Sequence, residues 1–130
     1  MKNLFLLSTA LYLMLPVLAQ KKETFDIVSY TPPKGWTKNN TAETVTFTKD
    51  WGNKYCVISL CKSIDATADA QQNFDNSWQV MATTSLGAGA VTMQPGSTDN
   101  GWETKIGSAP FDKDGLTGSA ILISSSKNNK

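Results

Sequence analysis

The sequence contains no histidine and no arginine, so all 12 of its basic residues are lysines. Without histidine, the chain cannot build Ser-His-Asp or Cys-His nucleophilic machinery, an imidazole proton shuttle or a histidine-containing zinc site. Without arginine, it lacks the planar fork that binds phosphate or carboxylate through two hydrogen bonds. The chemistry that remains open uses carboxylates, lysine, hydroxyl groups or thiols.

The first 19 residues predict a secretory signal peptide. Lys2 precedes the apolar run Leu4–Leu15, and Pro16–Ala19 supplies the small residues that signal peptidase reads, which predicts cleavage after Ala19. An uncleaved anchor is the alternative, but a helix from Leu4 to Ala19 reaches only about 24 Å across a hydrocarbon core of about 30 Å. No cysteine near the cleavage point could accept a lipid. We therefore expect a periplasmic or secreted protein without a stable membrane anchor after cleavage.

The expected mature chain, residues 20–130, has the length of a single domain. Once Lys2 is removed with the leader, the remaining lysines balance the 11 acidic residues. Such a balance gives no basic footprint, and we expect no nucleic-acid partner.

Two cysteines, Cys56 and Cys61, lie in the apolar, β-branched run Tyr55–Lys62, which predicts a central strand. An odd separation along a strand places the two side chains on opposite faces, with Cα atoms about 16 Å apart. We therefore predict two buried free thiols rather than a disulfide. A bridge would require that this segment is not extended.

Alternation of residues predicts further strands. Phe25–Tyr30 is expected to form the first, ended by Pro32-Pro33, and the turn Pro33–Gly35 leads to Trp36. In Thr44–Lys49, Val45 and Phe47 are expected to face inward and the threonines outward. Asp50–Asn53 is the predicted hairpin loop into the cysteine strand.

One amphipathic helix follows. Apolar side chains recur at helical spacing, at Ala70, Phe74, Trp78 and Met81, and Asp69 with Gln72 resembles a capping box. The segment 86–90, rich in glycine, is expected to end this helix.

The last third of the sequence predicts more strands: a short run at 91–93, then 102–106, and finally 116–124, with turns at 95–101 and 111–115. Strands, one helix and strands again predict an α+β fold, in which an antiparallel sheet carries one main helix on one face. Asn128-Asn129 reads as a hairpin turn with nothing after it. Two alternatives stay open here: the domain ends at Lys130, or it is truncated at its C-terminus.

The predicted order is a strand leading into Pro-x-Gly-Trp (Pro33–Trp36), a hairpin, one helix and then strands around Gly101-Trp102. This order resembles the Mog1/PsbP-type α/β/α sandwich. The chain is also similar to small secreted proteins of unknown function from Bacteroidetes-like bacteria. The resemblance implies a non-enzymatic binding or assembly role. That fold group usually closes with a further strand and helix, which this sequence lacks, and the resemblance supplies no functional residues.

The polar clusters favour structural roles. Asp112–Gly115 lacks the other acidic ligands of a calcium loop and predicts a plain turn. Asp65, Asp69 and Asp75 are expected to serve the helix start, and Lys127 beside Ser126 lies in a polar tail unsuited to nucleophilic catalysis. We therefore predict no catalytic residue, no metal site and no cofactor.

Four tryptophans are the remaining candidates. Trp78 belongs to the apolar stripe of the helix, and Trp36 and Trp102 are expected to fill the core. Trp51 differs because it lies in a hairpin tip between Asp50 and Gly52, where exposure is expected. An exposed tip tryptophan is a contact for a protein, a peptide or a glycan.

Two classes of function remain, and a third is a weaker alternative. The absent histidine and arginine favour an exported non-catalytic binding or accessory domain over a small carboxylate-dependent hydrolase. The third is a structural subunit that is completed by strand exchange with a partner.

Overall fold

The computed structural model describes residues 20–128, and the predicted signal peptide lies outside them. Across the described residues, three antiparallel sheets and one helix confirm the α+β prediction. The chain divides into two compact units, one ending at Lys62 and one beginning at Ser63, and each is described by itself. That residues 20–130 form a single domain stays a prediction. No helix within residues 20–128 combines the length and apolarity that a membrane crossing requires.

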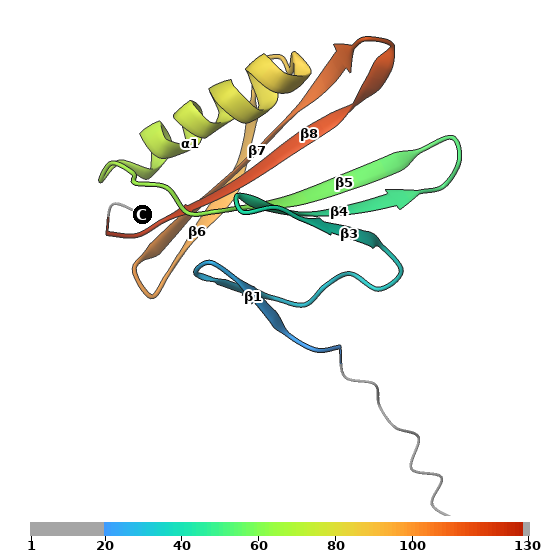
Figure 1. Ribbon diagram of the computed structural model, residues 1–130. Helices are drawn as coiled ribbons and strands as arrows, with labels where there is room; N and C mark the ends of the chain where they lie inside the picture. The colour runs from blue at the N-terminus through green and yellow to red at the C-terminus, as the bar shows by residue number, and fades with distance from the viewer. Residues whose placement is uncertain (1–19, 129–130) are drawn as a thin grey trace, which may run out of the picture. The chain divides into compact units, whose positions relative to one another are not determined.

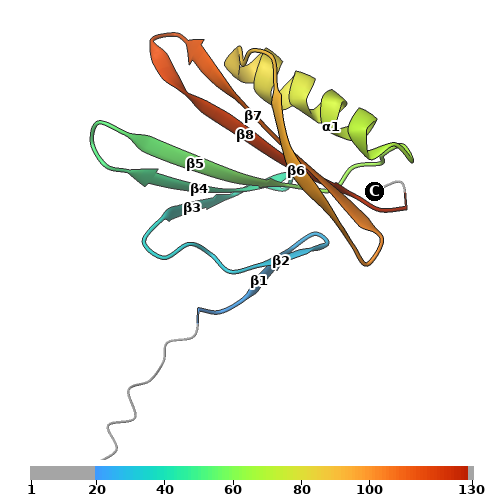
Figure 2. The ribbon, with the colours of Figure 1, turned by 180° about the vertical axis from the view of Figure 1, so that it is seen from behind.

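The first unit begins with a short hairpin of β1 (Glu23–Phe25) and β2 (Val28–Tyr30) (Figure 2). The prediction of one continuous strand over Phe25–Tyr30 is therefore wrong. Asp26 adopts a left-handed φ of 51°, a conformation that aspartate tolerates better than most residues, and the chain reverses there.

A three-stranded sheet completes this unit, with β4 (Thr44–Asp50) at its centre between β3 (Thr37–Asn40) and β5 (Tyr55–Cys61). Val45 and Phe47 are buried, as predicted from their alternation with threonine. The ring of Tyr30 meets that of Phe47 edge-on at 5.8 Å between centroids. Strand β3 escapes sequence analysis because its four residues are polar and exposed.

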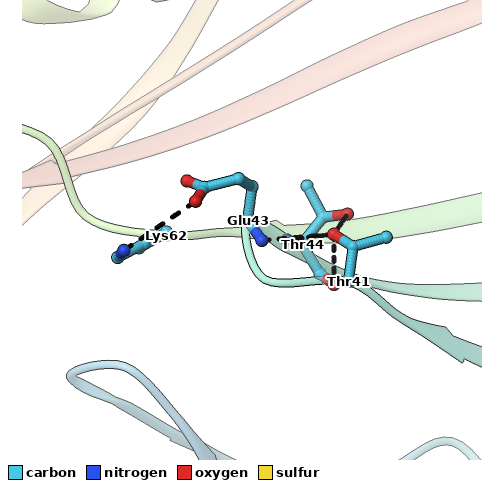
Figure 3. A network of polar contacts seen from close by, with 4 residues as sticks. All are labelled: Thr41, Glu43, Thr44 and Lys62. Carbon is cyan, nitrogen blue, oxygen red and sulfur yellow. Dashed lines mark hydrogen bonds and ion pairs between the residues drawn. The ribbon is translucent and has the colours of Figure 1, made fainter.

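The turn between β3 and β4 depends on the hydroxyl of Thr41, as Figure 3 shows. This oxygen accepts hydrogen bonds from the backbone N–H groups of Glu43 (3.2 Å) and Thr44 (2.9 Å). Lys62 then joins the same end of the sheet, because its N–H donates to the Glu43 carbonyl at 2.9 Å. Its ammonium lies 3.9 Å from the Glu43 carboxylate. These contacts fix where β4 begins and where β5 ends.

Both cysteines are free, as predicted, but they are exposed. The expectation of a central strand with buried thiols is wrong because β5 pairs only with β4 among the described strands and forms an edge of its sheet. Partial burial still raises the pKa of the Cys61 thiol.

The second unit contains the helix α1 (Ala70–Trp78) and its π-helical continuation η1 (Gln79–Thr84). Asp69 is the N-cap, as predicted, and its carboxylate accepts from the N–H groups of Gln71 (2.8 Å) and Gln72 (3.1 Å). The helix ends before Gly87, which has a left-handed φ of 68° and donates its N–H to the Thr83 carbonyl.

The apolar stripe of the helix continues through Ala82 and not through Met81, which is exposed. A π-helical turn contains more residues than an α-helical turn, so the inward position falls four residues after Trp78 instead of three. The expectation that Met81 belongs to the apolar stripe is therefore wrong, because it assumed an α-helical period throughout the helix.

A second three-stranded sheet packs against this helix: β6 (Thr92–Asp99), β7 (Trp102–Lys113) and β8 (Leu116–Ser126), paired in that order. The predicted turns are shorter than expected. β6 runs through Pro95-Gly96 with a register shift between Gln94 and Ser97, and the chain reverses only at Asn100-Gly101 and at Asp114-Gly115. All four turn residues have positive φ, which suits two-residue hairpin loops.

Helix α1 lies across β7 and β8, as Figure 1 shows. Phe74 and Trp78 stack with ring centroids 6.0 Å apart and face small residues of the sheet, among them Ala109 and Ala120. A Cβ atom at Gly107 would come within 2.6 Å of Phe74, so the glycine admits the aromatic ring. The small residues on these strands therefore set how closely the helix packs.

Candidate functional site

The loop between β4 and β5 presents the predicted contact residue. Its backbone is closed by a hydrogen bond from the Trp51 N–H to the Lys54 carbonyl at 2.8 Å. Gly52 has a φ of 84° and donates its N–H to the Asp50 carboxylate at 2.6 Å. These bonds hold the tip in a fixed shape, and Trp51 remains 56% exposed. The predicted exposure of Trp51 is confirmed.

Trp36 lies beside it. The two indole rings are perpendicular, at 88°, with centroids 6.0 Å apart, which is the edge-to-face geometry that aromatic rings prefer. We call Trp36 and Trp51 the tryptophan pair. Trp36 is half-buried and Trp102 is half-buried as well, so the expectation that both fill the core is wrong. Trp36 lies directly before β3, and Trp102 is the first residue of β7, so both rings lie at the end of a strand.

Lys49 of β4 contacts the turn that carries Trp36. Its ammonium donates to the Gly35 carbonyl at 2.7 Å, which holds the turn that carries Trp36 against β4. Gly35 has a φ of 75°, so the turn depends on a residue without a side chain. The tryptophan pair is therefore held by backbone and lysine contacts from two loops.

The sequence predicts that Trp51 is exposed but does not predict that Trp36 lies beside it. The signal available was the Pro33–Gly35 turn directly before Trp36, which places that ring at a loop end just as the hairpin places Trp51. No pattern in the sequence brings the two loops together, because the contact depends on the pairing of β3 with β4. The pair offers an apolar, rigid ring surface of the kind that binds a sugar face or an apolar side chain.

A second feature is a polar hollow of about 500 Å³ at the start of α1 in the second unit. Its lining residues are Thr67, Ala68, Ala70, Gly101, Glu103, Ser126, Lys127 and Asn128. The Lys127 ammonium already donates to the Asn100 carbonyl at 2.5 Å. A lysine engaged in this way does not resemble the desolvated base that a serine nucleophile requires.

Asn73 forms hydrogen bonds to two residues of this lining. Its amide donates to the Thr67 carbonyl (2.9 Å) and to the Ser126 hydroxyl (3.2 Å), and its oxygen accepts from the Thr67 N–H (2.8 Å). Asn73 is buried, so these bonds satisfy a polar side chain that would otherwise be costly to bury. The network joins the loop before α1 to the end of β8.

Two acidic residues near the start of α1 have structural partners. Asp69 caps the helix, and Asp75 accepts a hydrogen bond from the Gln71 side chain at 2.9 Å. Asp112 belongs to β7 and Asp114 to the turn after it. Among residues 20–128, no group of three or more acidic or cysteine side chains is arranged to hold a metal ion.

Comparison with known proteins gave no relative: no protein-family model, no curated protein and no solved structure matches the chain. The resemblance to the Mog1/PsbP-type sandwich therefore stays a prediction.

Proposed function

We propose that the protein is an exported, non-catalytic binding or accessory domain that contacts its ligand through the tryptophan pair. The observation that carries this proposal is Trp51, which is 56% exposed on a hairpin tip and rests edge-on against Trp36. The two rings together present apolar area on a fixed loop, and its burial by a partner would be favourable.

The fixed geometry of the tip supports the proposal. The Trp51 loop is closed by hydrogen bonds, and Lys49 holds the neighbouring turn, so little side-chain or loop freedom is lost on binding. A rigid ring surface suits the apolar face of a sugar, or a proline or aromatic side chain of a peptide or protein. These are the partner classes we propose.

Binding to arrays of glycans and peptides tests the proposal, followed by titration of the hits against tryptophan fluorescence. Trp51→Ala is expected to weaken binding at least tenfold, since truncating a tryptophan at the centre of a contact costs about 2 kcal/mol. Tyr55→Ala is the matched control, because Tyr55 is equally exposed on the same hairpin at 57%. Circular dichroism of both variants checks that the fold is kept.

Equal affinities of the wild-type protein and Trp51→Ala for a confirmed ligand would overturn the assignment of the site. Hydrolytic turnover that is abolished by an Asp→Asn substitution would overturn the non-catalytic class in favour of a carboxylate-dependent hydrolase. Export is tested separately by the mass of the secreted protein, for which we expect a first residue of Gln20.

A further inference from the structure

Strand β8 forms an edge of the sheet β6-β7-β8. All 11 of its residues, Leu116–Ser126, pair with β7 on one side, in one uninterrupted register. Within residues 20–128, no strand pairs with its other side. In such an edge, alternate residues direct an N–H and a C=O away from the sheet, ready to pair with another strand.

This edge lacks the features that usually prevent pairing. The opposite edge, β6, contains Pro95 and a register shift between Gln94 and Ser97, both of which interrupt a ladder. In contrast, β8 contains no proline, no charged residue and no irregularity. It is also long for a strand, since most have about five or six residues.

The two faces of β8 differ. Ala120 and Leu122 belong to the core beneath α1. Ile121 and Ile123 point to the other face and are 69% and 64% exposed. An edge strand with two adjacent exposed isoleucines on one face offers both main-chain hydrogen bonds and apolar side chains to a partner.

We propose that β8 pairs antiparallel with β8 of a second copy of this chain, giving a dimer with a continuous six-stranded sheet. In a symmetric antiparallel pair, one residue lies opposite its own copy. When Leu122 lies opposite its own copy, Ile121 of each chain lies directly opposite Ile123 of the other, which gives two isoleucine pairs. No other central residue gives this pairing. Both isoleucine pairs then fall on the face away from α1, where directly opposite side chains contact each other.

Charge favours the same strand over the other long edge, β5. In a symmetric pair of β5 strands centred on Ile58, Lys54 would lie opposite Lys62 of the second copy, and like charges directly opposite are destabilising. In the β8 pair, Lys127 lies opposite Thr117 instead. A second copy therefore offers β8 a strand of equal length and the same two isoleucines, and it places the flanking Lys127 opposite an uncharged residue.

Sedimentation of the purified protein over a concentration series tests the proposal. We expect a reversible monomer–dimer equilibrium. The double substitution Ile121→Lys/Ile123→Lys places lysines opposite each other in both pairs and removes both apolar contacts, so it is expected to raise the dimer dissociation constant at least about tenfold. Both side chains are exposed, so the fold of each copy has no reason to change.

Val80→Lys is the matched control, because Val80 is also 64% exposed but belongs to η1 and not to the β8 edge. It is expected to leave the dissociation constant unchanged. Hydrogen exchange supplies a second readout, since dimer formation should slow exchange of the outward amides of β8 and not of β6. A monomer at every concentration, or a dimer equally weakened by Val80→Lys, would overturn the proposal, as would a monomer whose β8 captures only an unrelated extended peptide.

Discussion

At the residue scale, one buried asparagine and one glycine determine how the helix of the second unit packs on its sheet. Asn73 is the buried polar residue whose bonds join the start of α1 to β8, and Gly107 is the position where the Phe74 ring meets the sheet. Neither role follows from residue type alone. An asparagine within a helical pattern usually predicts an exposed position, and a glycine within a strand predicts a weak strand.

Asn73→Ala is expected to destabilise the second unit by about 1–2 kcal/mol. The substitution removes the hydrogen bonds between the buried Asn73 amide and the Thr67 backbone, and each such bond contributes about 0.5–1.5 kcal/mol net, while the exposed Thr67 groups can bind water instead. Urea unfolding measures the change. Asn76→Ala is the control on the exposed side of the same helix and is expected to change stability by less than about 0.5 kcal/mol. Equal effects of the two substitutions would contradict the role of the network.

Gly107→Ala is expected to destabilise the protein by about 1–3 kcal/mol through overpacking. The added Cβ would lie 2.5 Å from the Val91 side chain and 2.6 Å from Phe74, so the helix or the strand must move. Gly89→Ala is the control, because a Cβ there meets nothing within 4 Å. The difference between the two thermal unfolding midpoints tests the prediction, and a Gly107→Ala variant as stable as the control would refute it.

At the scale of the elements, the structure agrees with the sequence pattern at the start of the helix and differs from it at the ends of strands. The helix begins where Asp69 predicts, because capping is a local interaction that needs only the next three residues. Strand boundaries were predicted less well. Pro95-Gly96 suggested a turn, yet pairing with β7 carries β6 through them at the cost of a register shift.

Asp69→Ala is expected to destabilise the second unit by about 1 kcal/mol, since two backbone N–H groups at the start of α1 lose their acceptor. Asp69→Asn keeps an acceptor oxygen and is expected to retain most of that stability. Chemical unfolding of both variants measures the effect. If asparagine destabilised as much as alanine, the carboxylate would be acting through charge and not as a cap.

For the molecule as a whole, residues far apart in the sequence form a charged contact in the first unit that spacing does not suggest. Glu23 of β1 forms an ion pair with Lys38 of β3 and accepts a hydrogen bond from the Tyr30 hydroxyl at 2.8 Å. These contacts join the β1–β2 hairpin to the sheet. The hydrogen bonds from Lys38 and Tyr30 lower the pKa of the Glu23 carboxyl, and the bond to Glu23 raises the pKa of Lys38.

The sign of the pH dependence follows from these shifts. Because the pKa of Glu23 is lower in the folded state, its contribution is complete above the pKa of the unfolded chain and is lost as the pH falls through the folded value. The Lys38 contribution is complete below the unfolded pKa of lysine and is lost only as the pH rises through its raised value. We therefore expect the contact to be present at neutral pH and to weaken in acid.

Carbon NMR titration of the Glu23 carboxyl measures this directly. Its midpoint should lie below that of an ordinary glutamate and should move up towards it in Lys38→Met. Lys54→Met is the control, a lysine on the β4–β5 loop with no role in this ion pair. A midpoint unchanged by Lys38→Met would contradict the contact.

The sequence by itself determined the class of fold, the helix with its N-cap, the inward positions Val45 and Phe47, and the exposed Trp51. These features depend on periodicity and on interactions between residues close in the chain. The tertiary structure alone decided that Trp36 lies against Trp51, that β5 and β8 form edges, that the cysteines are exposed and that Asn73 is buried. Each of these depends on which strands pair and what covers them, and residues far apart in the chain decide that.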